Sequence, residues 1–171
     1  SNPPYNMKWK APAFAQIQPR FSDCYVVPPE SNANFAFILT GLENNDRCVF
    51  LLPASVMSGG TKEEMDIRKY LIEKNMVDAV IICPDNMFES TGIGTCIIIL
   101  DKNKSTATTE MVDLRRKYSE EVREQNGQYG GKAHTNRTYK KTFKVITEET
   151  MEESIEAIQE RKNIPEFCKP V

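Results

Sequence analysis

The sequence predicts an α/β fold, in which helices cover a sheet of mostly parallel strands. Residues 48–52, 77–82 and 95–100 are short, continuous apolar runs, which are typical of strands buried on both faces. A helical pattern separates the first two runs, so we expect a right-handed parallel crossover between them. The link from the second run to the third is too short for a helix, so the third strand is expected to be antiparallel.

Two helices are predicted around the first strand. The first begins near residue 31 and ends at Asn44 and Asn45. Its apolar positions recur at helical spacing and are Phe35, Ile38, Leu39 and Leu42. The second helix begins at a capping box, in which the Thr61 hydroxyl accepts from a backbone amide and Glu64 reaches back. It is expected to run to about residue 74 and to bury Ile67 and Leu71.

The two ends of the chain differ from this middle part. Six of the ten prolines lie in residues 1–30, which predicts a long irregular loop. Residues 102–110 are polar and are expected to form a surface loop. Residues 111–125 are predicted to be helical from the spacing of Met111, Leu114, Tyr118 and Val122. Thr147 is expected to cap a last helix that buries Met151, Ile155 and Ile158.

The composition restricts the classes of function. The net charge of −2 is unlike that of a stand-alone nucleic-acid-binding module, which is usually strongly basic. The five cysteines are scattered and the one histidine is His134, a pattern that does not suggest a metal site. Cys48, Cys83 and Cys96 are expected to be buried thiols in a reducing compartment. No apolar run is long enough for a membrane span, and we expect a cytoplasmic protein.

The chemistry is expected to lie in the tetrapeptide Asn2-Pro3-Pro4-Tyr5. It matches the Asn/Asp-Pro-Pro-Tyr/Phe signature of enzymes that methylate planar, conjugated amino groups. Such a nitrogen is a poor nucleophile, and the Asn2 side chain and the Pro3 carbonyl can each accept one of its hydrogens in the transition state. Both prolines stiffen the loop, and Tyr5 offers a flat face to a flipped base. The alternatives are a peptide ligand for phosphotyrosine-binding-type domains and a terminal tail.

Longer stretches carry a family resemblance. Residues 1–9, 34–39, 50–53, 67–71, 78–81, Phe88 and 95–100 resemble, in order and spacing, the methylation subunits of type I restriction–modification systems. Residues 121–127 and 134–141 resemble a tail found in one branch of that family. The resemblance implies transfer of a methyl group from S-adenosylmethionine to adenine N6 in DNA, without a covalent enzyme intermediate. It also implies partnership with a specificity subunit and a restriction subunit.

The resemblance implies a particular fold and a missing part. Residues 1–101 correspond to the C-terminal half of a class I, Rossmann-like methyltransferase sheet with one antiparallel strand inserted between two others. Residues 102–171 would be a polar loop and a helical C-terminal extension. In the family a glycine-rich cofactor loop precedes the tetrapeptide, and neither Gly59-Gly60 nor Gly130-Gly131 replaces it. We therefore expect this chain alone to bind the cofactor poorly and to be inactive.

Further site residues are weighed against structural roles. The resemblance suggests Phe88 as a second wall of the target-base pocket, and packing under the sheet edge is the alternative. Contacts with DNA are expected from one set of residues: Lys8, Trp9, Arg137, Lys140 and Lys141. Local packing of Trp9 and a solvated basic loop over residues 132–144 are the alternatives.

Three rival functions remain at this point. The same tetrapeptide serves methyltransferases that act on RNA or on a protein glutamine amide. A non-catalytic module that docks a partner protein is the rival from another class. If a strand that precedes Ser1 is missing, the edge of strand 48–52 is left unpaired. We then expect self-association through that edge, or disorder in residues 1–30.

Overall fold

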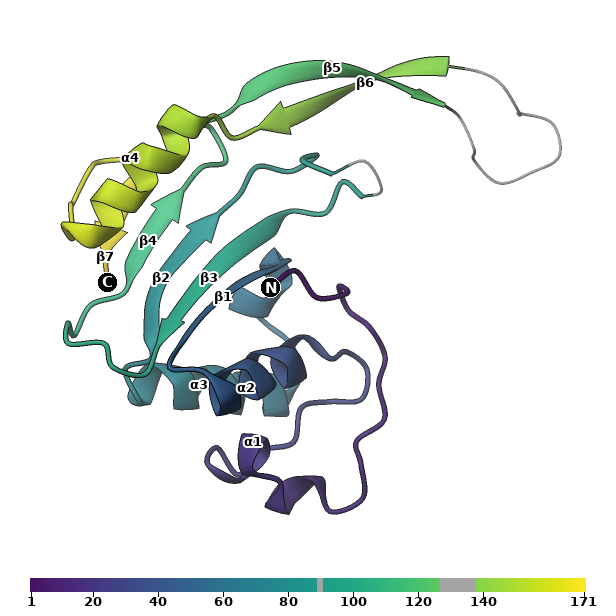
Figure 1. Ribbon diagram of the computed structural model, residues 1–171, viewed down its shortest axis with the longest axis vertical. Coiled ribbons are helices and arrows are strands. Elements are labelled where there is room, and N and C mark those ends of the chain that lie inside the picture. The colour runs from purple at the N-terminus through teal and green to yellow at the C-terminus, as the bar shows by residue number, and fades with distance from the viewer. Residues whose placement is uncertain (89–90, 127–137) are drawn as a thin grey trace, which may run out of the picture.

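The computed structural model describes residues 1–88, 91–126 and 138–171. It contains a five-stranded sheet, a separate two-stranded hairpin and helices on both faces of the sheet (Figure 1). The strands are β1 (Arg47–Pro53), β2 (Val77–Ile82), β3 (Thr95–Asp101), β4 (Glu110–Asp113), β5 (Ser119–Asn126), β6 (Thr138–Val145) and β7 (Cys168–Pro170). The helices are η1 (Ala15–Ile17), α1 (Pro19–Ser22), α2 (Asn34–Asn44), η2 (Ala54–Met57), α3 (Lys62–Glu73) and α4 (Glu148–Gln159).

The topology of the first three strands confirms the prediction. The sheet has the order β1-β3-β2-β4-β7, and β3 lies between β1 and β2, antiparallel to both. β1 and β2 therefore run in the same direction, joined by α3, as the crossover rule requires. β2 also pairs in parallel with β4. The carboxyl ends of β1, β2 and β4 consequently lie along one edge of the sheet.

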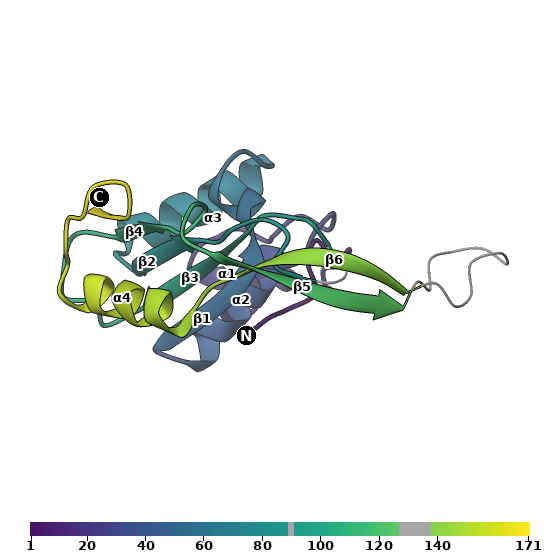
Figure 2. The same cartoon turned by 90° about the horizontal axis from the view of Figure 1, so that it is seen from above.

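Helices cover the two faces unequally. Phe35 and Ile38 of α2 and Ile67 of α3 pack with the β1 side of the sheet in the larger core. Ala157 and Ile158 of α4 pack with β2 and β4 on the opposite face. Alternation along β2 explains this division, because Val80 points into the first core while Ala79 and Ile81 point into the second. In Figure 2, α3 and α4 lie on opposite sides of strands β2 and β3.

The helix boundaries follow the predicted caps. The Thr61 hydroxyl accepts from the Glu64 backbone amide, and the Glu64 carboxylate accepts from the Thr61 amide, which completes the capping box of α3. Thr147 caps α4 by accepting from the Thr150 amide at 3.2 Å. The expected buried stripe of α4 is wrong at Ile155, which is 49% exposed. The buried residues of α4 are Ser154, Ala157 and Ile158.

The predicted helix over 111–125 is also wrong. The segment forms strand β4, a turn and strand β5, so the extension beyond residue 101 is not mainly helical. Met111 lies on β4 and Val122 lies on the hairpin, 61% exposed, so their helical spacing is a coincidence. β4 and β7 add two strands to the sheet, and residues after 101 therefore share the core of residues before it.

Residues 1–30 follow a defined path outside the sheet. Trp9 donates its backbone amide to the Glu30 carbonyl, and the Met7 carbonyl accepts from the Ala33 amide. β1 is an outer strand, and its edge is partly covered by Ser1, whose nitrogen donates to the Val49 carbonyl at 2.6 Å. The Leu51 amide donates to the Ser1 carbonyl at 3.0 Å. In the part of the chain that the structure describes, no helix has the length and apolarity needed to cross a membrane.

Candidate active site at the carboxyl edge of the sheet

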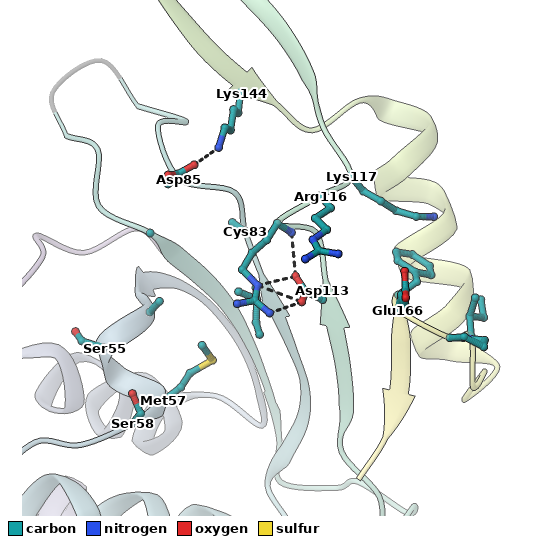
Figure 3. Close-up of a pocket in the computed structure, with 17 residues that line it drawn as sticks. Ser55, Met57, Ser58, Cys83, Asp85, Asp113, Arg116, Lys117, Lys144 and Glu166 are labelled. Atoms are coloured by element: carbon teal, nitrogen blue, oxygen red, sulfur yellow. Dashed lines mark hydrogen bonds and ion pairs between the residues drawn. The ribbon is translucent and has the colours of Figure 1, made fainter.

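A cleft of about 1170 Å³ opens where β2 and β4 end. Its walls are the segment after β1, the loop after β2, the turn after β4, the base of the hairpin and residues 164–167 (Figure 3). Loops at the carboxyl ends of parallel strands are the usual position of ligand sites in α/β sheets. This cleft and the tetrapeptide lie at the same edge, because Tyr5 approaches Cys83, which lines the cleft.

The tetrapeptide is held at both of its ends. Ser1 is bonded to β1 on one side, and Asn6 is bonded to the first residue of α2 on the other. Between these anchors Pro3 is buried, whereas Asn2 and Pro4 are exposed. Among the described residues, the Asn2 side chain has no hydrogen-bond partner, so its amide oxygen is available to an incoming donor.

The surroundings of Tyr5 keep its phenol neutral. Burial raises the pKa of Tyr5, and the nearby Cys83 and Cys96 raise it further. Burial also raises the pKa of Cys83, and burial followed by the neighbouring Cys83 raises the pKa of Cys96 to about 12. These thiols therefore stay protonated near neutral pH and are poor nucleophiles. The confirmed burial of Cys48, Cys83 and Cys96 fits their predicted role as small core residues.

The cleft carries cations that sequence reasoning did not single out. Arg115 forms a paired contact with both carboxylate oxygens of Asp113, with the shortest distance at 2.6 Å. Arg115 holds the pKa of Asp113 below its usual value. Arg116 extends from the same turn into the cleft (Figure 3). In the sequence these cations are visible as the basic triplet at residues 115–117. The incorrect helix prediction placed the triplet on a helix instead of at the end of a strand, where ligand sites lie.

The residues expected to contact DNA are dispersed. Lys8 is exposed. The Trp9 ring lies against Phe21 with 5.9 Å between ring centroids, and its indole nitrogen donates to the Pro29 carbonyl at 2.8 Å. Trp9 therefore packs locally against Phe21. A contact between Trp9 and DNA stays a prediction. Lys140 and Lys141 lie on β6 of the hairpin, and Arg137 lies outside the described residues.

Phe88 lies in the loop between β2 and β3 and is half-buried. This loop also contains Asp85, whose carboxylate accepts a hydrogen bond from Lys144 of the hairpin. Phe88 therefore belongs to the same edge of the sheet as Tyr5, as a base-pocket role would require. Its role stays a prediction.

Gly59 and Gly60 form a turn that packs against α3. A side-chain atom added at Gly60 would overlap the Glu64 carboxylate, so that carboxylate already fills the space at the start of α3. The Gly59 carbonyl accepts from Arg68. Side chains of α3 therefore occupy the space beside this turn.

Comparison with known proteins identifies the family. The family model described as N-6 DNA Methylase matches residues 1–171. The chain belongs to the N-6 DNA methylase family. It is 36% identical over 110 residues to the type I restriction enzyme MpnII methylase subunit of Mycoplasma pneumoniae, covering 61% of this chain and 20% of that subunit. It is 35% identical over 108 residues to the HindI methylase subunit of Haemophilus influenzae, covering 61% and 24%.

Solved structures of similar proteins agree with the fold. The type I restriction–modification methyltransferase subunit from Streptococcus thermophilus has a TM-score of 0.80 and 30% identity, covering 99% of this chain and 33% of that one. A modification subunit of a putative type I restriction enzyme from Vibrio vulnificus, at 10% identity and a TM-score of 0.61, shares the fold. The predicted resemblance to type I methylation subunits is confirmed. The chain spans about a fifth to a third of the lengths of these relatives.

Proposed function

We propose that this N-6 DNA methylase chain is the part of a type I modification subunit that binds and activates the target adenine for N6 methylation of DNA. The observation that carries the proposal is the tetrapeptide at the carboxyl edge of the sheet, with Asn2 free to accept and Tyr5 half-buried beside it. Fold and family agree with this assignment. The chain would form the C-terminal half of the Rossmann-like catalytic domain.

The proposed chemistry uses two hydrogen-bond acceptors and one aromatic ring. The side-chain oxygen of Asn2 and the carbonyl of Pro3 accept the two hydrogens of the adenine amino group. Both bonds strengthen as the nitrogen becomes tetrahedral, so they stabilise the transition state more than the ground state. Tyr5, as a neutral phenol, stacks on the extruded base, and Phe88 is proposed as the opposite wall.

The methyl donor is proposed to bind elsewhere in the subunit. S-adenosylmethionine is the donor expected of this family, and the turn at Gly59 and Gly60 is closed by Glu64. Its site is therefore assigned to parts of the subunit that this chain does not include. The isolated chain is expected to have no methylation activity, and we place the complete enzyme in the cytoplasm.

Partners follow from the same proposal. The relatives are named as subunits of type I restriction enzymes, so a specificity subunit and a restriction subunit are proposed as partners. Lys8, Trp9, Arg137, Lys140 and Lys141 remain proposed DNA contacts. Self-association through the outer edge of β1 is proposed for the isolated chain, because Ser1 occupies only part of that edge.

The test is product analysis with the complete enzyme. The full-length subunit containing this chain, assembled with its specificity subunit, is incubated with S-adenosylmethionine and, separately, duplex DNA, RNA or a glutamine-containing protein substrate. N6-methyladenine in DNA, detected by mass spectrometry, is the expected product. Methylated RNA or methylglutamine with unmodified DNA would replace the proposal by one of its enzymatic rivals. No product together with partner binding would favour a docking module.

A further inference from the structure

Asn6 and Asn34 form a reciprocal pair directly after the tetrapeptide. The Asn6 backbone amide donates to the Asn34 side-chain oxygen at 3.1 Å. The Asn34 side-chain nitrogen donates back to the Asn6 side-chain oxygen at 2.9 Å. The backbone donor fixes the orientation of the Asn34 amide, because only an oxygen can accept from it. Its nitrogen is thereby assigned as the donor to Asn6.

Asn34 is well placed to hold another segment still. It is 2% exposed, and it is the first residue of α2, whose next residue, Phe35, is buried in the larger core. Its own amide donates to the Asn32 side chain at 3.3 Å. A buried carboxamide that lost its partners would remain desolvated and unpaired, which is costly. The arrangement therefore strongly favours the paired conformation.

Asn6 has a backbone conformation that needs such support. Its φ of 51° lies in the left-handed region, which asparagine tolerates better than most residues. This turn comes immediately after Tyr5, so it determines the direction in which the chain leaves the tetrapeptide. The next residue, Met7, is held by the Ala33 amide at 2.8 Å. Residues 6 and 7 are thus both bonded to the start of α2.

We propose that Asn34 is a positioning residue that fixes the Asn2-Pro3-Pro4-Tyr5 loop through Asn6. It does not touch the substrate. It acts by holding the turn after Tyr5, while the bonds of Ser1 to β1 hold the other end of the loop. The consequence for catalysis depends on the proposed function, whereas the mechanical coupling of Asn34 to the loop does not.

The pair allows an asymmetric test with nearly isosteric variants. Asn6→Asp keeps both bonds, because the new carboxylate still accepts from Asn34 and the backbone amide is unchanged. Asn34→Asp keeps the acceptor for the Asn6 amide but loses the donor, and its carboxylate then faces the Asn6 side-chain oxygen. A simple space-filling role for either side chain predicts equal effects. Asn44→Ala is the control in the same helix, since Asn44 is exposed and its side chain donates to the Thr40 carbonyl of that helix.

The first measurement is amide hydrogen exchange of the 171-residue chain by NMR. In Asn34→Ala, exchange at the Asn6 amide should accelerate by about tenfold, the effect of one lost hydrogen bond. In Asn34→Asp the acceleration should be smaller, because the acceptor for the Asn6 amide is kept while its carboxylate repels the Asn6 side-chain oxygen. The amides of β3 should exchange as in wild type, which shows that the fold is retained. Asn6→Asp and Asn44→Ala should exchange at the wild-type rate. Unchanged Asn6 exchange in Asn34→Ala would overturn the coupling, as would equal acceleration in the two aspartate variants.

The second measurement is turnover of the assembled methyltransferase. Asn34→Asp should lower kcat by about 10- to 100-fold through misplacement of the loop, with KM for DNA within about twofold of wild type. Asn6→Asp should retain most of kcat. Equal kcat in Asn34→Asp and wild type would refute the positioning role. A wild-type enzyme that does not methylate adenine would instead refute the proposed function, and the exchange experiment would still decide the coupling.

Discussion

Lys144 of β6 donates a hydrogen bond to the carboxylate of Asp85, which lies in the loop after β2. The Lys144 backbone amide donates to the Asn86 carbonyl at 3.2 Å. Its ammonium group also lies 4.7 Å from the centre of the Tyr118 ring. The base of the β5–β6 hairpin is therefore tied to the loop that contains Phe88, and the two should move together.

The first prediction concerns the pH dependence of the ion pair between Lys144 and Asp85. Hydrogen bonding to Lys144 lowers the pKa of Asp85, and hydrogen bonding to Asp85 raises the pKa of Lys144. The contribution of Asp85 is thus present above its unfolded pKa and lost as pH falls through its lowered folded pKa. That of Lys144 is present below its unfolded pKa and lost as pH rises through its raised folded pKa. The ion pair between Lys144 and Asp85 should therefore be intact around neutral pH.

This prediction is checked by NMR titration of the Asp85 carboxyl carbon. Lys144→Met should raise the pKa of Asp85 toward the value of an isolated aspartate, and high salt should have a similar but smaller effect. Lys140→Met, on the same strand, should leave the Asp85 titration unchanged. An unaltered pKa in Lys144→Met would show that the contact does not persist in solution.

The second prediction compares two arginines that share one aspartate. Arg161 bonds Asp78, which is 5% exposed, and lies 4.0 Å from the fully buried Glu110. Arg47 approaches Asp78 at 3.6 Å from an exposed position. Arg161→Ala should lower the free energy of unfolding by about 3 kcal/mol, because Asp78 loses its nearer cation and the fully buried Glu110 loses the cation beside it. Arg47→Ala should cost less than about 1 kcal/mol. Urea unfolding measures both, and similar losses would contradict the assignment.

The ion pairs of Arg161 with Asp78 and Glu110 explain why part of the fold was not predictable from the sequence. The directions of β1, β2 and β3 followed from apolar runs and linker lengths, which are local properties, and the position of β3 between the other two followed from the family resemblance. β4 has only four residues, and its buried first residue is Glu110, which reads as polar surface in the sequence. Its cation, Arg161, is far away along the chain. Burial of this charge depends on tertiary contacts that local patterns do not contain, so the segment was assigned to a loop and a helix.

The site was predictable to a similar extent. The tetrapeptide is recognisable because its chemistry needs four adjacent residues. The arginines at 115–116 and Lys144 meet the loop after β2 only through the correct pairing of β4 and of the hairpin. Asn34 lies in one of the stretches that carry the family resemblance, but nothing in the sequence indicated its contact with Asn6, which lies 28 residues earlier.

The third prediction concerns the start of α3. Thr61→Ala removes the hydroxyl that accepts from the Glu64 amide and should lower the free energy of unfolding by about 1 kcal/mol. Thr61→Ser should keep most of that stability, because it keeps the acceptor. Thermal unfolding followed by circular dichroism compares the two. Equal stability of the alanine variant and wild type would mean that the capping bond contributes nothing.

The fourth prediction separates the two roles of Phe88. If Phe88 forms a wall of the base pocket, Phe88→Ala should lower kcat/KM for DNA methylation in the assembled enzyme by at least about tenfold, since stacking on a base contributes about 1–3 kcal/mol. The free energy of unfolding should change little, because the side chain is only half-buried. Phe88→Tyr should retain activity. A loss of stability with normal activity would assign Phe88 to packing.

The central claim is that Asn2 activates the target amino group, and the measurement that tests it most directly is single-turnover methylation by the assembled enzyme carrying Asn2→Ala. The account predicts a rate at least about 100-fold below wild type, as for other groups that stabilise charge in a transition state. Binding of DNA and of S-adenosylmethionine should stay within about threefold, because Asn2 is exposed and bears no structural bond among the described residues. Methylation by Asn2→Ala at the wild-type rate would contradict the account.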